Sequence, residues 1–282
     1  MSLWLHQLGH ELVKLFARRR TYIGFAAFVV LQVAIVALLQ HPRAQDEVGG
    51  LLEQNGLAFE EYYNGLTLAI ATIAFSFTFL GGLYVALVAG DIVAKEVEDG
   101  TMRMVLARPI GRTRLLMVKL TACVIYTVSL VLFLGVTALA FATAYRGGLG
   151  KLFIFIDPEN LFAFYDTGEG LWRYARSVVC LAYGTLTVAA LAFMFSCFRV
   201  KPAAATILTL SVFFIDVVLT NMPAFFGIRH WFMSYHIGFW VRTYHEVEPW
   251  PAIGRSALYL AGLSTTFVVV GVTRFGVRDL KG

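Results

Sequence analysis

The sequence DIVAKEVEDGTMRMVLARPIGRTRLLMVK (Asp91–Lys119) is a charged segment that lies between two apolar runs. Each run is long enough to cross a bilayer, which needs about 20 residues of helix. Within the segment the acids come first, a Gly-Thr pair follows, and a proline and several arginines come last. We expect a membrane protein that keeps such an ordered polar segment on one face to present it to a soluble partner.

The composition excludes a soluble domain. Of the 282 residues, 59% are hydrophobic and only 15% are charged, and 24 are phenylalanine. Soluble domains have an apolar share of about half and a charged share of about a quarter. The chain is therefore predicted to be an integral membrane protein.

Six apolar runs of about 18 to 25 residues alternate with polar connections, and a helix of that length spans the hydrocarbon core. The prediction is an all-α membrane protein with a six-helix transmembrane domain over residues 21–282. The six predicted transmembrane helices are Tyr22–Leu39, Leu66–Gly90, Leu120–Ala144, Val178–Phe198, Pro202–Thr220 and Ser256–Thr273.

The distribution of lysine and arginine predicts the orientation. The N-terminal segment, the second and fourth connections and the C-terminus hold fifteen of the 23, and the other three connections hold eight. By the positive-inside rule, both termini and the segment 91–119 are cytoplasmic in a multi-pass protein of the cytoplasmic (inner) membrane. The net charge of +5 then reflects topology and contact with anionic lipid, not nucleic acid.

Residues 1–20 have the pattern of an amphipathic helix that lies along the membrane interface. Leu5, Leu8, Leu12 and Leu15 recur at helical spacing, and polar residues such as Glu11 lie on the other side. Two functions remain open for this helix, because it could serve only as an anchor or could also contact a cytoplasmic subunit.

The charged segment is predicted to fold in three parts. The second transmembrane helix continues beyond the membrane and ends at Gly100, because the left-handed position after a helix favours glycine. Thr101 is expected to cap a short helix, Met102–Ala107, that Pro109 ends. Gly111 then permits a turn, and Arg112, Arg114 and Lys119 return the chain to the lipid headgroups.

The motifs EVEDGT (96–101), LARP (106–109) and GR (111–112), in a chain with six spans and an amphipathic N-terminal helix, resemble the permease subunit of an ATP-binding-cassette exporter of the type-2 family. That family includes permeases for sodium extrusion, bacteriocin immunity and maturation of nitrous oxide reductase. Gly111 departs from the family, in which Ser or Thr is frequent. The resemblance implies that segment 91–119 contains a coupling helix that binds a nucleotide-binding ATPase subunit. The coupling residues it implies are Glu96, Glu98, Asp99, Gly100, Thr101, Arg103, Leu106, Pro109 and Arg112.

The resemblance also implies export, a second copy of the chain or a related permease as partner, and ATP and Mg²⁺ in the ATPase subunit only. This agrees with the sequence, in which Gly147–Lys151 mimics part of a phosphate-binding loop but lacks its first glycine and its hydroxyl residue. We therefore expect no catalytic residue and no cofactor in this chain. Among substrates, a lipid, a hydrophobic peptide or an amphiphilic drug fits the apolar spans better than a sugar does.

Asp216 is the only acid inside a predicted span. A carboxylate in a membrane is costly and usually serves a function, so a substrate or ion role is one interpretation. The other is that it reaches water or pairs with Arg229 or Arg242. A secondary transporter or channel that uses Asp216 is the alternative to the ATP-driven permease.

Two outer segments are rich in aromatic residues. Residues 221–255 are expected to form short helices that dip into the outer leaflet, and the resemblance implies a re-entrant hairpin that closes the outer gate, with Phe225, Phe226 and Trp231 as gate candidates. Residues 145–176 form the other outer loop and could cap the pathway. We expect no metal site, since the three histidines of 221–255 and the three cysteines lack metal-ligand spacing.

Gly82, Ala86 and Gly90 lie four residues apart on the second predicted span. Small residues at this spacing let two transmembrane helices approach closely. The contact could be ordinary packing or a surface that slides during transport.

Overall fold

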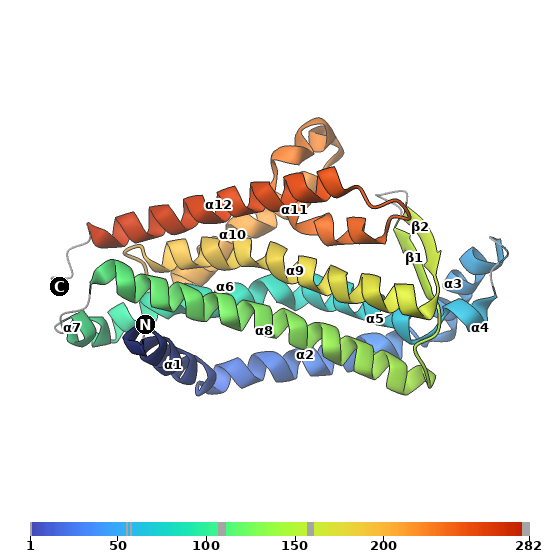
Figure 1. Cartoon of the computed structure of the whole chain (residues 1–282), viewed down its shortest axis with the longest axis horizontal. Helices are drawn as coiled ribbons and strands as arrows, with labels where there is room; N and C mark the ends of the chain where they lie inside the picture. The colour runs from blue at the N-terminus through green and yellow to red at the C-terminus, as the bar shows by residue number, and fades with distance from the viewer. Residues whose placement is uncertain (1, 55, 57, 107–110, 157–160, 278–282) are drawn as a thin grey trace.

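A computed structural model describes residues 2–54, 56, 58–106, 111–156 and 161–277. Long helices run side by side along one axis and form an elongated bundle (Figure 1). The short helices α3 and α4 and a two-stranded sheet lie at one end, and α7 lies at the other.

The first half of the described chain contains α1 (Ser2–Phe16), α2 (Arg19–Leu38), α3 (Pro42–Gln54), α4 (Phe59–Tyr62), α5 (Gly65–Ser76), the π-helical segment η1 (Phe77–Gly81), α6 (Gly82–Glu98), α7 (Thr101–Leu106) and α8 (Arg112–Arg146). The second half contains β1 (Leu152–Ile156), β2 (Leu161–Tyr165), α9 (Thr167–Ser196), α10 (Pro202–Asn221), the 3₁₀ segments η3 (Pro223–Trp231) and η4 (Gly238–Tyr244), α11 (Met233–Ile237) between them, and α12 (Trp250–Gly276).

Five helices in the described part of the chain are long and apolar enough to cross a membrane, namely α2, α8, α9, α10 and α12. The predicted second span consists of α5, η1 and α6 in succession, and of these α5 is an apolar helix too short to cross alone. The sixth crossing therefore stays a prediction. A π-helical turn inside a helix often marks a functional position.

Helix α9 occupies the centre of the bundle and packs against α6, α8, α10 and α12. About two thirds of the most apolar 18-residue stretch of α9 is buried, whereas only 11% and 17% of the corresponding stretches of α10 and α12 are buried. Those two helices expose their apolar side chains because lipid or a further protein chain, and not this chain, covers them in a membrane.

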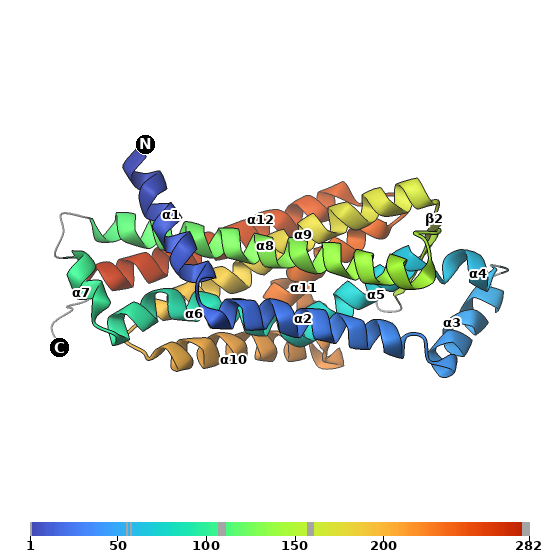
Figure 2. The same ribbon diagram turned by 90° about the horizontal axis from the view of Figure 1, so that it is seen from below.

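The amphipathic N-terminal helix is present as α1, and it ends four residues before the predicted boundary at residue 20. It leaves the bundle axis obliquely at the start of α2 (Figure 2). The hydroxyl of Thr21 donates a hydrogen bond to the carbonyl of Leu15 at 2.7 Å and holds this turn. Leu8 and Leu15 are buried, and α1 packs against α8.

The described chain is mostly helical, as predicted, but the prediction of an all-α fold missed one pair of strands. Strands β1 and β2 form an antiparallel hairpin in which Leu152 pairs with Tyr165 and Ile156 with Leu161. Alternate residues of β2 are buried, and Phe162 and Phe164 between them are exposed. Aromatic and β-branched residues at alternate positions favour a strand when one face packs on other elements. Helix α9 begins directly after the hairpin, so the predicted loop 145–176 is shorter than expected.

The small residues of the second span do lie against a neighbouring helix. A Cβ atom added at Gly90 would lie 2.9 Å from the Thr206 hydroxyl oxygen, and one at Gly82 would lie 2.9 Å from the Phe213 ring. Both neighbours belong to α10, and Ala86 between the glycines is fully buried. The prediction of close helix packing is thus confirmed, and a sliding role stays a prediction.

Candidate functional site

The predicted coupling segment lies at one end of the bundle, together with α1 and the C-terminal end of α12 (Figures 1 and 2). Helix α6 ends at Glu98, and Gly100 has the predicted left-handed conformation with φ +72°. Helix α7 follows at Thr101, and α8 begins at Arg112. The Arg112 guanidinium donates a hydrogen bond of 3.1 Å to the carbonyl of Gly276, which joins this segment to the end of α12.

Helix α7 has one buried and one exposed methionine. Met102 is 1% exposed and anchors the helix in the core, while Met104 is 68% exposed. A flexible, exposed methionine is typical of surfaces that bind another protein. Sequence reasoning did not single out Met104, although its offset of two residues from Met102 on a helix indicates different faces.

Thr101 does not cap α7. It is the first residue of that helix, and its hydroxyl donates backwards to the carbonyl of Glu96 at 3.2 Å. The end of α6 and the start of α7 are therefore held together by this bond and by the glycine between them. Arg103 and Leu106 lie on α7, and Pro109 lies outside the described residues.

The acids of the segment occupy two different environments. Glu98 and Asp99 are exposed, and both pair with Lys95 at 3.1 and 3.2 Å. Exposed pairs of this kind contribute little to stability, typically about 0 to 1 kcal/mol. These carboxylates are therefore accessible to a partner.

Glu96 is instead 3% exposed and belongs to an ion cluster with Glu11, Lys14 and Lys119, in which Glu96 and Lys119 are buried while Glu11 and Lys14 are partly exposed. The Lys119 ammonium is fully buried and lies 2.7 Å from the Glu96 carboxylate and 2.9 Å from that of Glu11. Lys14 forms a further ion pair with Glu96. The cluster joins α1, α6 and α8 with two positive and two negative charges.

The charges of the cluster stabilise the ionised form of Glu96. Burial by itself raises the pKa of this carboxyl, but Lys119 and Lys14 outweigh that effect and hold the pKa below its ordinary value of 4.5. In this conformation Glu96 does not face a partner, in contrast to its predicted role as a direct contact. Its position four residues after the buried Ile92 was the sequence signal for an inward orientation.

Helix α9 is tied to the same part of α6. The hydroxyl oxygen of Ser196, the last residue of α9, accepts hydrogen bonds from the backbone amides of Val93 and Ala94 at 3.0 and 2.9 Å. All three residues are buried in the core. Any movement of the C-terminal end of α6 would therefore also move the end of α9, the central helix of the bundle.

Asp216, near the C-terminal end of α10, acts as a tertiary cap of α11. Its two carboxylate oxygens accept hydrogen bonds from the backbone amides of Met233 and Ser234 at 2.9 and 2.6 Å. These are the first amides of the helix, which have no partner within it. The carboxylate of Asp216 thus binds backbone amides, and not the arginine partner or the open water that were the expected alternatives.

The candidate gate residues lie on the outer segment. Phe226 and Trp231 are 53% and 68% exposed, and Phe225 packs its ring edge-to-face on Phe232. Short helices are present here, as predicted, and their entry into the membrane stays a prediction. Within the described residues, no three metal-ligating side chains meet.

Comparison with known proteins identifies the family of this chain. A family model described as "ABC-2 family transporter protein" matches residues 9–249. The chain is also similar to the uncharacterized protein YhcI of Bacillus subtilis (strain 168), with 27% identity over 218 residues. That similarity covers 73% of this chain and 66% of YhcI, slightly less than two thirds of its length. With a family match over most of its length and several helices able to span a membrane, the chain belongs to the ABC-2 transporter family as a multi-pass membrane permease.

Proposed function

We propose that this permease couples ATP hydrolysis by a separate nucleotide-binding subunit to the export of an amphiphilic substrate across the cytoplasmic membrane. ATP and Mg²⁺ would bind only to that subunit. The observation that carries the proposal is the coupling segment itself, a short helix with an exposed methionine next to two exposed carboxylates at the end of a bundle helix.

Movement of α7 would reach the bundle through three connections. The glycine and the Thr101 bond hold α7 to α6, the ion cluster joins α6 to α1 and α8, and Ser196 joins α6 to α9. These contacts favour displacement of α7 and the end of α6 as a unit. ATP and substrate would then bias the same two conformations of the bundle.

A second copy of this chain, or a related permease, would complete the transport pathway. Helix α10 supports this proposal because Phe214 and Ile215 are 69% and 58% exposed on a helix that buries little apolar surface. Lipid is the other environment that would cover them. In this arrangement both ends of the chain would lie on the cytoplasmic side, with the coupling segment.

The secondary-transporter alternative depends on Asp216 as a carboxylate that binds an ion or a proton. Both of its oxygens already accept hydrogen bonds from backbone amides, and this favours a structural role. The ATP-driven permease is therefore the function that the geometry supports better.

The test is co-purification in detergent after co-expression with a candidate nucleotide-binding ATPase subunit. We expect the wild type to retain the ATPase and Glu98→Arg/Asp99→Arg to lose it, because the reversal places positive charge on the contact surface. Glu246→Arg is the matched control, since this exposed acid lies between η4 and α12, outside the coupling segment. Equal ATPase recovery with all three proteins, each with an unchanged melting temperature, would refute the proposed contact surface.

A further inference from the structure

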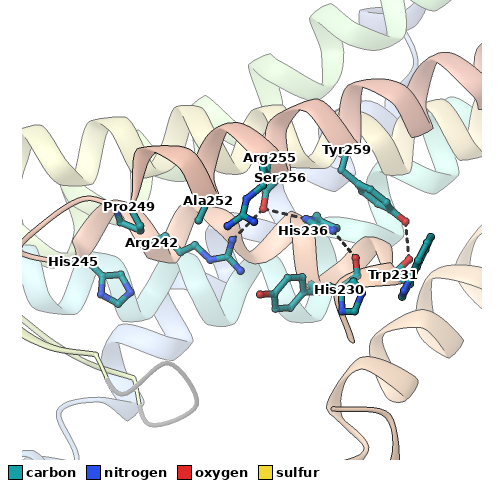
Figure 3. A pocket seen from close by; sticks show the side chains of 11 residues that line it. His230, Trp231, His236, Arg242, His245, Pro249, Ala252, Arg255, Ser256 and Tyr259 are labelled. Carbon is teal, nitrogen blue, oxygen red and sulfur yellow. Dashed lines mark hydrogen bonds between the residues drawn. The ribbon is translucent and has the colours of Figure 1, made fainter. Parts of the chain in front are cut away.

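A cavity of about 620 Å³ lies between residues 230–245 and the first turns of α12 (Figure 3). Its walls come from η3, α11 and η4 on one side and from Pro249 to Tyr259 on the other. Arginine, histidine and aromatic side chains line it, and none of its lining residues is an acid. The cavity is far from the coupling segment. A subunit that binds to the coupling segment is therefore not needed to fill the cavity.

Arg242 supplies a buried positive charge to this cavity. Its side chain is 8% exposed, donates one hydrogen bond of 3.1 Å to the Ser256 hydroxyl, and stacks its guanidinium 4.9 Å from the centre of the Tyr235 ring. A guanidinium has five N–H donors. Among the ion pairs of the described residues, none involves Arg242 or the exposed Arg255, which also lines the cavity.

A hydrogen-bond chain fixes the wall next to Arg242. Arg242 donates to Ser256, the Ser256 hydroxyl lies 3.0 Å from Nδ1 of His236, and Nε2 of His236 lies 2.9 Å from the carbonyl of His230. A carbonyl only accepts, so Nε2 carries the proton and Nδ1 accepts from the hydroxyl. The Ser256 hydroxyl thereby accepts one bond from Arg242 and donates one to His236, and the remaining Arg242 donors are left for an occupant of the cavity.

Asp216 does not line the cavity, and among the described residues it forms no ion pair with Arg242 or Arg255; its carboxylate oxygens accept hydrogen bonds from the α11 amides instead. Burying an uncompensated charge is costly unless an opposite charge pairs with it. Guanidinium groups match phosphate oxygens particularly well, with two parallel hydrogen bonds. Tyr235 and Tyr259 offer apolar ring faces beside that position.

We propose that this cavity binds a phosphate-bearing anion through Arg242 and Arg255. The same phosphate chemistry is available from the headgroup of an anionic lipid in the outer leaflet and from a soluble phosphate compound. The proposal is independent of ATP coupling, since binding is measured on the permease alone.

Native mass spectrometry of the detergent-purified permease tests the proposal with two probes, phosphatidylglycerol and inorganic phosphate. We expect Arg255→Gln to weaken binding about tenfold, the loss of one charged hydrogen bond. Arg242→Gln should weaken it more, and Arg242→Lys should restore part of it. Arg229→Gln is the matched control, because Arg229 contacts the same Tyr235 ring from outside the cavity. It should bind both probes like the wild type.

The two probes distinguish the sources. Arginine-dependent retention of phosphatidylglycerol that millimolar phosphate does not displace identifies the lipid headgroup, and arginine-dependent binding of phosphate itself identifies a soluble anion. If Arg242→Gln fails to fold, Arg255→Gln still decides, since its exposed side chain supports no described hydrogen bond. Binding of neither probe, or equal binding by Arg255→Gln, Arg229→Gln and the wild type, would overturn the proposal.

Discussion

Removal of the Glu96 charge is the most informative perturbation of the ion cluster. Glu96→Gln keeps the shape of the side chain but leaves the fully buried Lys119 ammonium with Glu11 as its remaining acid. Removing one partner of a buried pair costs about 3–5 kcal/mol. Because the Glu11 carboxylate still lies 2.9 Å from Lys119, we expect a loss of about 3 kcal/mol in the free energy of unfolding.

The assay is denaturant unfolding in detergent, applied as a double-mutant cycle with Lys119→Met. Each single variant should be strongly destabilised, whereas the double variant should lose less than the sum of the two by about 2 kcal/mol, since no buried charge of the pair is left alone. Lys95→Met is the matched control, because its pairs with Glu98 and Asp99 are exposed, and it should cost less than about 1 kcal/mol. Additive losses in the cycle, or a loss for Glu96→Gln no larger than for the control, would refute the structural role of the cluster.

Three further predictions follow from other contacts. Asp216→Ala should lower the free energy of unfolding by about 1–2 kcal/mol, because the α11 cap is lost, and the ion dependence of transport should not change. A transport rate that loses its dependence on sodium or protons would instead support the secondary-transporter alternative. Gly90→Leu should destabilise the fold by about 1–3 kcal/mol, because the new side chain would displace Thr206. Gly9→Leu is the control and should not destabilise the fold, since Gly9 has open space around it. Equal melting temperatures of the two variants would contradict the close packing at Gly90. The pKa of Glu96 is depressed, so its stabilisation is present above its ordinary pKa of 4.5 and is lost as pH falls through the lowered value. Unfolding measured from pH 7 downward should show this loss in the wild type and not in Glu96→Gln.

Much of the coupling segment was predictable because its signals are local. Glycine is required where the chain turns left-handed, and Gly100 has a positive φ as expected. The amphipathic helix, the outer short helices and the small face of the second span likewise follow from spacing along one element. The strands β1 and β2 were missed because their alternation of buried and exposed residues is short. Such an alternation favours a strand only when other elements cover one of its faces.

Side-chain partners were not predictable, since they depend on which helices meet. Lys119 was expected at the headgroups and is instead fully buried, because α1 and α6 bring Glu11 and Glu96 to it. Asp216 was expected either to serve transport or to reach water or an arginine, and it instead caps a helix that begins 17 residues later.

Composition and periodicity by themselves determined a helical membrane protein with an ordered polar segment, because burial in lipid and backbone hydrogen bonding act on each helix separately. Only the tertiary structure decided which of its charges are exposed. The energy of a buried charge depends on the distance to its counter-charge, and that distance is set by the packing of helices far apart in the chain. Glu96 and Glu98, two residues apart, therefore differ completely, one buried between two lysines and the other exposed beside α7.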